Sequence, residues 1–84
     1  MADIFEIEIA TPEKLVLKQR AESAQIPGKD GYMGILPGHA ALLSELGEGI
    51  LSITLSGKTE DFRVIGGYVE VRDDHVRVLA DQIV

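Results

Sequence analysis

Gly57-Lys58-Thr59 is the run of residues in this sequence that most resembles a chemical motif, because it has the composition of the end of a phosphate-binding loop. Such a loop cradles phosphate with backbone amides and a lysine at the start of a helix, and it requires another glycine five positions earlier. Ser52 stands at that position, and alternating residues on both sides predict strands. We interpret the run as a hairpin turn.

The other residues able to do chemistry are isolated. Gly47-Glu48-Gly49 lacks the third glycine of a dinucleotide fingerprint and is typical of a turn. His39 and His75 lie far apart, without the close spacing of metal ligands. Asp73-Asp74 is interpreted as a turn, since paired acids need a pocket for acid-base work. We predict no catalytic, metal or cofactor-binding residues, no cofactor, and a protein that is not an enzyme.

Lys58 supports a different hypothesis, in which the chain is a biotinyl- or lipoyl-type carrier domain with its modified lysine on a hairpin tip. Such domains are also small, acidic and all-β. Gly57 and Thr59 do not resemble the usual neighbours of that lysine. A further alternative is a module that binds extended peptides along an exposed sheet edge.

The composition limits the partners. The 84 residues form one domain, 1–84, with 45% apolar and 26% charged residues, as in ordinary globular proteins. Eight basic and fourteen acidic residues give 8 − 14 = −6, the wrong sign for nucleic acid or an anionic membrane surface. The chain contains no cysteine, so packing must hold the fold without disulfides.

The amino-terminal segment from Met1 to Ala10 is acidic, at Asp3, Glu6 and Glu8, where a secretory leader requires positive charge. We therefore expect no export by that route. No apolar run approaches the roughly 20 residues that cross a bilayer, so any membrane association is predicted to be indirect.

Apolar residues alternate with polar ones along most of the chain, which is the period of a strand with one buried face. Shorter strands are predicted at 14–18 and 21–26, and two hairpins turn near Gly57-Lys58 and at Asp73-Asp74. Only residues 40–46 are compatible with a helix, and they are equally compatible with a strand. The pattern predicts an all-β sandwich or barrel. The residues expected to be buried are Phe5, Ile7, Leu51, Ile53, Phe62, Val64, Val69, Val71, Val76 and Val78.

From Gly31 to Ser44 the sequence has no Asp, Glu, Lys or Arg, although a charged fraction of 26% predicts about four in such a stretch. Depletion of charge is typical of interface cores and also of buried strands. Pro37-Gly38-His39 must interrupt regular structure, and a turn buried within its own domain leaves backbone groups without partners. The stretch is therefore predicted to be a surface that a partner covers, with core packing as the alternative.

The same stretch resembles the epsilon subunit of bacterial F-type ATP synthases. The resemblance is carried by these landmarks and extends over nearly the whole chain: Thr11-Pro12, Pro27-Gly28, Gly31, Gly34-Ile35, Leu36-Pro37-Gly38-His39-Ala40, Leu42-Leu43, Gly49, Gly66-Gly67-Tyr68, Val71 and Val78-Leu79-Ala80-Asp81. It implies a flattened sandwich or pseudo-barrel of about ten short strands in two sheets. It also implies a non-catalytic rotor subunit of the central stalk, peripheral to the cytoplasmic face of the bacterial plasma membrane and attached only through the complex.

The partners implied by the resemblance are the gamma subunit and the c ring, with no nucleic acid and no small-molecule ligand. The residues it assigns to the gamma contact are Leu36, Pro37, Gly38, His39, Ala40, Ala41 and Leu42. The residues it assigns to the c-ring contact are Gly28, Lys29, Asp30, Gly31 and Tyr32.

The sequence departs from the family in three ways. Ala41 stands where the family usually has proline, and Tyr32 stands where the turn toward the ring commonly has an acid, which leaves Asp30 as the nearby charge. The family's C-terminal helical hairpin is absent from these 84 residues, which end at Val84. We therefore expect this form neither to inhibit ATP hydrolysis by extending that hairpin nor to bind nucleotide.

Overall fold

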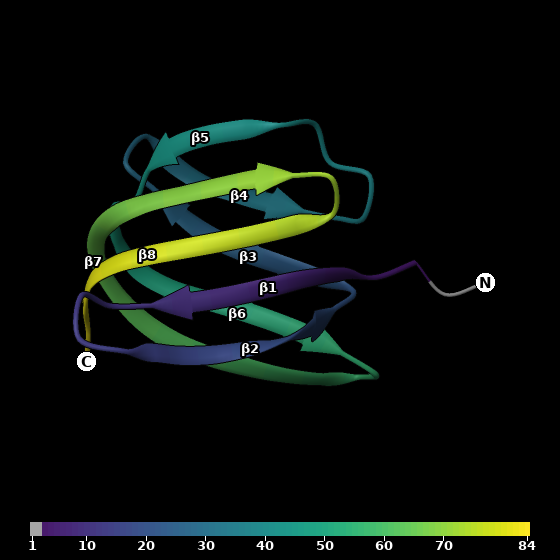
Figure 1. The fold of residues 1–84 in the computed structure, drawn as a ribbon, viewed down its shortest axis with the longest axis horizontal. Helices are drawn as coiled ribbons and strands as arrows, with labels where there is room; N and C mark the ends of the chain where they lie inside the picture. The colour runs from purple at the N-terminus through teal and green to yellow at the C-terminus, as the bar shows by residue number, and fades with distance from the viewer. Residues whose placement is uncertain (1–2) are drawn as a thin grey trace.

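The computed structural model describes residues 3–84, so Met1 and Ala2, the first residues of the acidic segment considered above as a leader, lie outside the described residues. All of the regular structure within this range is β-strand (Figure 1). The strands are β1 (Phe5–Ala10), β2 (Leu15–Ala21), β3 (Ser23–Gly28), β4 (Gly31–Ile35), β5 (Leu42–Glu45), β6 (Glu48–Leu55), β7 (Lys58–Arg72) and β8 (His75–Ile83).

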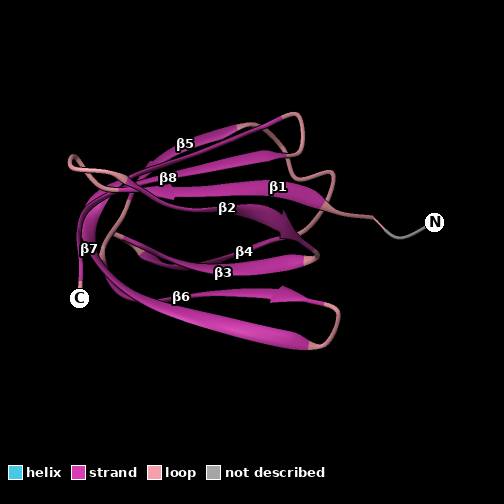
Figure 2. Ribbon diagram, turned by 60° about the horizontal axis from the view of Figure 1, so that its bottom comes forward, coloured by secondary structure: helices cyan, strands magenta, loops and turns pink. Residues whose placement is uncertain are grey.

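The strands are hydrogen-bonded in the order β2-β1-β8-β7-β6-β3-β4, and β5 pairs separately with β7. The pairs are antiparallel apart from β1 with β8, which is parallel. Figure 2 shows the strands folded into two layers. β5, β8, β1 and β2 lie in one layer, β3, β4 and β6 lie in the other, and the bent strand β7 runs from one layer into the other. The predicted all-β sandwich is confirmed.

Residues 3–84 form eight strands, fewer than the predicted ten or so, and β7 is one reason. This 15-residue strand runs through Gly66-Gly67 and pairs with β6 in its first part and with β5 in its last. The two glycines adopt φ of +66° and +115°, which bends the strand without ending its pairing with β8. A Cβ on Gly67 would overlap the carbonyl oxygen of Leu79. The pair therefore forms a corner rather than a turn.

The core lies between the two layers and contains only apolar side chains among the buried residues of the described range. The residues predicted to be buried are so, except Phe62, which is half-buried against the core. The core also contains Ile9, Ala21, Ala24, Ile26, Ile35, Leu46 and Ala80. Alternation of burial along β1 and β8 follows the period of two from which these strands were predicted.

Both predicted hairpins are present. Ser56-Gly57 turns between β6 and β7 with φ of +52° and +77°, and Asp73-Asp74 turns between β7 and β8 with φ of +50° and +58°. Positive φ at both central positions is the geometry whose twist matches a two-residue hairpin. The ambiguous segment 40–46 contains the strand β5 and no helix, because Leu42–Glu45 pairs with the second half of β7.

Candidate interaction surfaces

The loop between β4 and β5 contains most of the predicted gamma-facing residues. Leu36 is 62% exposed, and Ala40 and Ala41 are also exposed. His39 is half-buried, with its Nδ1 2.7 Å from the carbonyl oxygen of Ala40. Leu42 differs from these residues, since it begins β5 and packs against the core. The loop thus presents small and apolar side chains to solvent.

The backbone of this loop finds partners within the chain. The N–H of Gly38 donates to a carboxylate oxygen of Asp74 at 2.7 Å, and the N–H of His39 donates to the carbonyl of Leu36 at 3.1 Å. The loop lies at the surface, so water also reaches its polar groups. The amides of Gly38 and His39 therefore need no covering partner to be satisfied, and exposure of apolar side chains is the stronger evidence for an interface.

The charge-free stretch 31–44 combines both of the alternatives considered for it. Ile35 is buried and Met33 packs against the core, as the core interpretation requires. Tyr32, Leu36 and Leu43 are instead 55%, 62% and 71% exposed. Alternation along the strands separates the two groups, because neighbouring side chains point to opposite faces.

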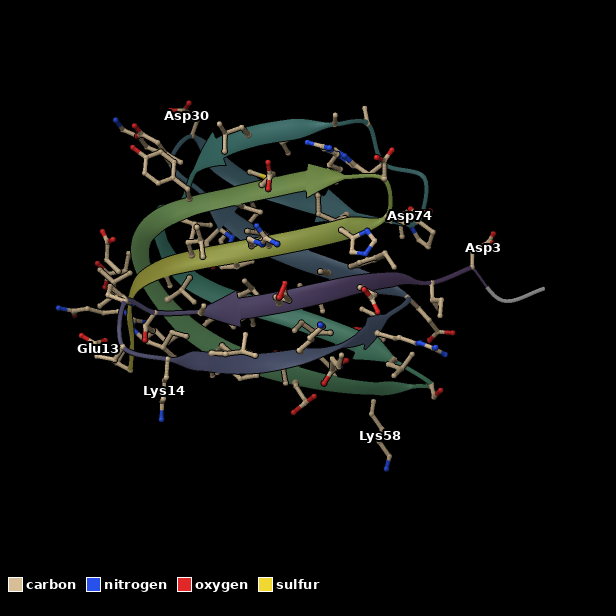
Figure 3. All side chains as sticks on the ribbon, viewed as in Figure 1. Asp3, Glu13, Lys14, Asp30, Lys58 and Asp74 are labelled. Atoms are coloured by element: carbon tan, nitrogen blue, oxygen red, sulfur yellow. The ribbon has the colours of Figure 1, made fainter. Side chains whose placement is uncertain are left out.

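The predicted c-ring residues form the tight turn between β3 and β4. The Nζ of Lys29 lies 3.1 Å from a carboxylate oxygen of Glu45, and the N–H of Lys29 donates to the carbonyl of Glu45 at 3.0 Å. Asp30 is exposed at the tip, and Figure 3 shows it at the edge of the molecule. The charge of Lys29 is thus paired with that of Glu45, whereas the Asp30 carboxylate faces outward.

The two predicted surfaces are at opposite ends of β4 and do not form one site. The turn 28–31 precedes this strand and the loop 36–41 follows it, and Figure 1 places the two connections at opposite ends of the long axis. A strand of five residues is about 17 Å long.

A further exposed apolar group begins at Leu43, next to the loop, and continues along β7 and β8 toward the end of β5 where Glu45 contacts Lys29. Tyr68 and Leu79 face each other across β7 and β8 and are 52% and 50% exposed, and Leu43 lies on the same outer face, opposite Glu70. The sequence signal that could have identified these residues is their position in the alternation of the strand. Tyr68 shares its face with Glu70, and an apolar residue at a position where alternation predicts a polar one indicates a contact surface.

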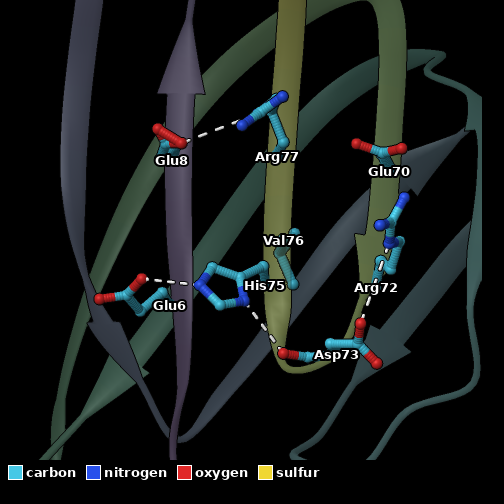
Figure 4. Close-up of a pocket in the computed structure, with 8 residues that line it drawn as sticks. All are labelled: Glu6, Glu8, Glu70, Arg72, Asp73, His75, Val76 and Arg77. Atoms are coloured by element: carbon cyan, nitrogen blue, oxygen red, sulfur yellow. Dashed lines mark hydrogen bonds and ion pairs between the residues drawn. The ribbon is translucent and has the colours of Figure 1, made fainter.

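Toward the Asp73-Asp74 turn, this outer face is charged (Figure 4). The Nε2 of His75 lies 3.0 Å from a carboxylate oxygen of Glu6, and the Nε of Arg77 lies 3.7 Å from Glu8, so both pairs join β1 to β8. These side chains line an open, shallow hollow. Exposed pairs of this kind stabilise a fold only weakly, by about 0 to 1 kcal/mol.

No cluster of three or more His, Asp or Glu side chains suited to a metal occurs within residues 3–84. Lys58 begins β7 beside the Ser56-Gly57 turn, and Figure 3 shows its side chain extending into solvent. None of the strands leads into a helix in this range, so the phosphate-loop interpretation has no structural context. The described part of the chain also has no helix long and apolar enough to cross a membrane.

The fold is that of a small all-β domain with exposed apolar side chains, and comparison with known families is more specific. The profile described as "ATP synthase, Delta/Epsilon chain, beta-sandwich domain" matches residues 4–84. The chain belongs to this family. It is 56% identical over 81 residues to the ATP synthase epsilon chain of Koribacter versatilis and 47% identical over 81 residues to that of Solibacter usitatus.

These matches cover 96% of this chain but 57% and 60% of the two relatives, so the chain spans somewhat more than half of their length. Among solved structures, a chain in the Euglena gracilis mitochondrial ATP synthase (OSCP/F1/c-ring) matches with a TM-score of 0.89 and 26% identity. That match covers 100% of this chain and 54% of the other. These relatives do not favour the carrier-domain alternative.

Proposed function

We propose that this chain is a non-catalytic rotor component of the central stalk of an F-type ATP synthase, linking the gamma subunit to the c ring and coupling proton translocation to ATP synthesis. The observation that carries the proposal is the pair of exposed surfaces at opposite ends of β4, in a member of this family. A linker must contact one partner at each end. The names of the two bacterial relatives support membership of this assembly, since both relatives are named ATP synthase epsilon chain.

The gamma-facing surface is proposed to comprise residues 36–42 together with Leu43, Tyr68 and Leu79. Leu36 and Leu43 are the most exposed leucines of the described chain, and Tyr68 and Leu79 continue the apolar area from Leu43 along β7 and β8, away from the loop. Apolar and aromatic side chains grouped in this way provide the core of a protein interface, and the charged face beside them provides a polar rim.

The c-ring-facing surface is proposed to be the turn 28–32. It is polar, and Asp30 is its outward carboxylate, which suits a basic or amide-rich loop on the partner. Membrane association then arises through the ring rather than through this chain. The proposed location is the cytoplasmic face of the bacterial plasma membrane, as a peripheral part of the enzyme, and the relatives' names support membership of an ATP synthase.

The experiment is reconstitution of a bacterial ATP synthase from which the epsilon chain has been depleted. We expect this chain to co-purify with the enzyme and to restore ATP-driven proton pumping. A chain from which residues 36–43 have been replaced by a Gly/Ser linker serves as the negative control. Failure of the unaltered chain to bind either the gamma subunit or the assembled enzyme would refute the proposal.

A further inference from the structure

Tyr32 makes a hydrogen bond across the outer face of the β3–β4–β6 layer. Its hydroxyl oxygen accepts the N–H of Ile50 at 2.9 Å. Tyr32 belongs to β4 and Ile50 to β6, and β3 pairs with both of these strands. The side chain therefore bridges two strands that are not neighbours in the sheet.

The Ile50 amide needs this partner because the sheet separates at this point. Pairing of β3 with β6 extends from Ser23↔Thr54 to Gln25↔Ser52 and stops there. Beyond it β3 continues to Pro27, which has no N–H to donate. On the β3 side, the phenolic hydroxyl of Tyr32 takes the place that a strand carbonyl would have held.

Gly49 provides the space for the tyrosine. A Cβ at this position would overlap the Tyr32 hydroxyl and lie 3.0 Å from the Cβ of Pro27. Pro27 is fully buried and pairs with Tyr32 across β3 and β4. Tyr32, Pro27 and Gly49 thus pack closely beside the partner-facing turn.

The same turn is fixed on its other side by the connection between β5 and β6. The N–H of Lys29 donates to Glu45 at 3.0 Å, and the N–H of Gly47 donates to the carbonyl of Pro27 at 2.9 Å. A Cβ on Gly28 would come within 2.7 Å of the carbonyl oxygen of Gly31, so the turn itself is tight. Without the Tyr32 bond, the β4 side of the turn would lack an equivalent anchor to β6.

We propose that Tyr32 is a positioning residue that holds the turn 28–31 at a fixed place relative to β6, so that Asp30 is presented to its partner by a rigid element. The hydrogen bond and the packing of Gly49 carry the first part, and the partner contact rests on the proposed function. A turn that is ordered before it binds loses less conformational entropy on association. Tyr32 thereby favours binding indirectly, because it orders the turn that presents Asp30.

The chain contains a matched control, because its second tyrosine, Tyr68, is exposed to a similar degree. Within residues 3–84 the Tyr32 hydroxyl has the bond to Ile50, whereas the Tyr68 hydroxyl has no hydrogen-bond partner. Amide hydrogen exchange by NMR should show the Ile50 amide exchanging about tenfold faster in Tyr32→Phe, with Val64 unchanged. Tyr68→Phe should leave Ile50 unchanged. Equal protection of Ile50 in both variants would overturn the proposal.

Binding to the epsilon-depleted enzyme separates a positioning role from a merely structural one. If Tyr32 positions the turn, Tyr32→Phe should weaken binding about three- to tenfold while the denaturation midpoint changes little. Faster Ile50 exchange with unchanged binding would overturn the positioning of the partner contact. If the unaltered chain does not bind at all, the proposed function fails while the exchange result still decides whether the turn is anchored.

A double-mutant cycle tests the role of Gly49 independently. Gly49→Ala should raise the unfolding equilibrium constant strongly when Tyr32 is present, because the new methyl overlaps its hydroxyl. In the Tyr32→Phe background the increase should be about tenfold smaller, since the overlapping atom is gone. Strictly additive effects would show that the two residues are not coupled and would contradict the proposed packing.

Discussion

The carboxylate of Asp74 accepts a hydrogen bond at 2.7 Å from the amide of Gly38, 36 residues earlier in the chain. The carbonyl of Asp74 also accepts the N–H of Glu6 at 2.9 Å. The β7–β8 turn therefore connects the exposed loop 36–41 to the start of β1. Tyr32 performs a comparable task at the other end of β4, where its hydroxyl bonds β6 beside the turn 28–31. A side-chain hydrogen bond to a distant part of the chain therefore supports each proposed contact surface.

Asp74→Ala is expected to release the Gly38 amide and to increase its rate of hydrogen exchange. Asp73→Ala is the matched control, because both aspartates adopt positive φ and both alanines suffer the same backbone strain. The Asp73 carboxylate is 3.9 Å from Arg72, and both groups are exposed. We expect Asp74→Ala to cost about 0.5 to 1.5 kcal/mol more than Asp73→Ala in urea denaturation. Equal costs, with Gly38 equally protected, would contradict this assignment.

Three glycines provide a graded test of the β7 corner. Gly67→Ala should destabilise the fold by at least about 2 kcal/mol, because its Cβ would overlap Leu79 and its φ is +115°. Gly57→Ala should cost about 1 kcal/mol, since φ is +77° but nothing lies within 4 Å. Gly34→Ala has neither problem and should change the free energy of unfolding by less than about 0.5 kcal/mol. A different order of denaturation midpoints would refute the role given to the corner.

Strands were predictable from this sequence because burial follows alternation closely, as in β8, where Val76, Val78 and Ala80 are buried between exposed neighbours. The corner at Gly66-Gly67 was not, since two glycines also begin many turns. Whether the strand ends there depends on pairing with β8 on both sides of the glycines, which is a long-range property. The predicted count of strands was too high partly for this reason.

The candidate surfaces were less predictable from the sequence than the strands were. The loop 36–41 was found because it lacks charge and resembles a known family, but its residues remain a prediction. The grouping of Leu43 with Tyr68 and Leu79 depends on the register between β5, β7 and β8. Local sequence does not determine that register. The hydrogen bond of Tyr32 depends on the place where β3 and β6 separate, which no short motif indicates.

The core is expected to respond strongly to truncation. Ile53→Ala or Val64→Ala should lower the free energy of unfolding by about 2 to 4 kcal/mol, because each side chain is fully buried between the layers and its removal leaves a cavity. Glu60→Ala, at an exposed position of β7, is the control and should change it by less than about 0.5 kcal/mol. Urea denaturation followed by circular dichroism measures the difference. Unchanged midpoints for the core variants would contradict the assigned packing.

The gamma-facing surface is tested most directly by Leu43→Asp. Leu43 is 71% exposed, so the substitution should leave the domain folded while placing a charge within the proposed contact, at a cost of no more than about 1 kcal/mol from the like charge of Glu70 opposite it. We expect affinity for the purified gamma subunit to fall at least about tenfold, equivalent to about 1.4 kcal/mol. Leu15→Asp is the matched control, since this leucine is 56% exposed on β2, at the far edge of the same layer, and should bind within about twofold of the unaltered chain. Equal loss of affinity in both variants would indicate a nonspecific effect of charge. Wild-type affinity in Leu43→Asp would show that gamma does not cover β5, and the proposed surface would then have to be restricted to the loop 36–41.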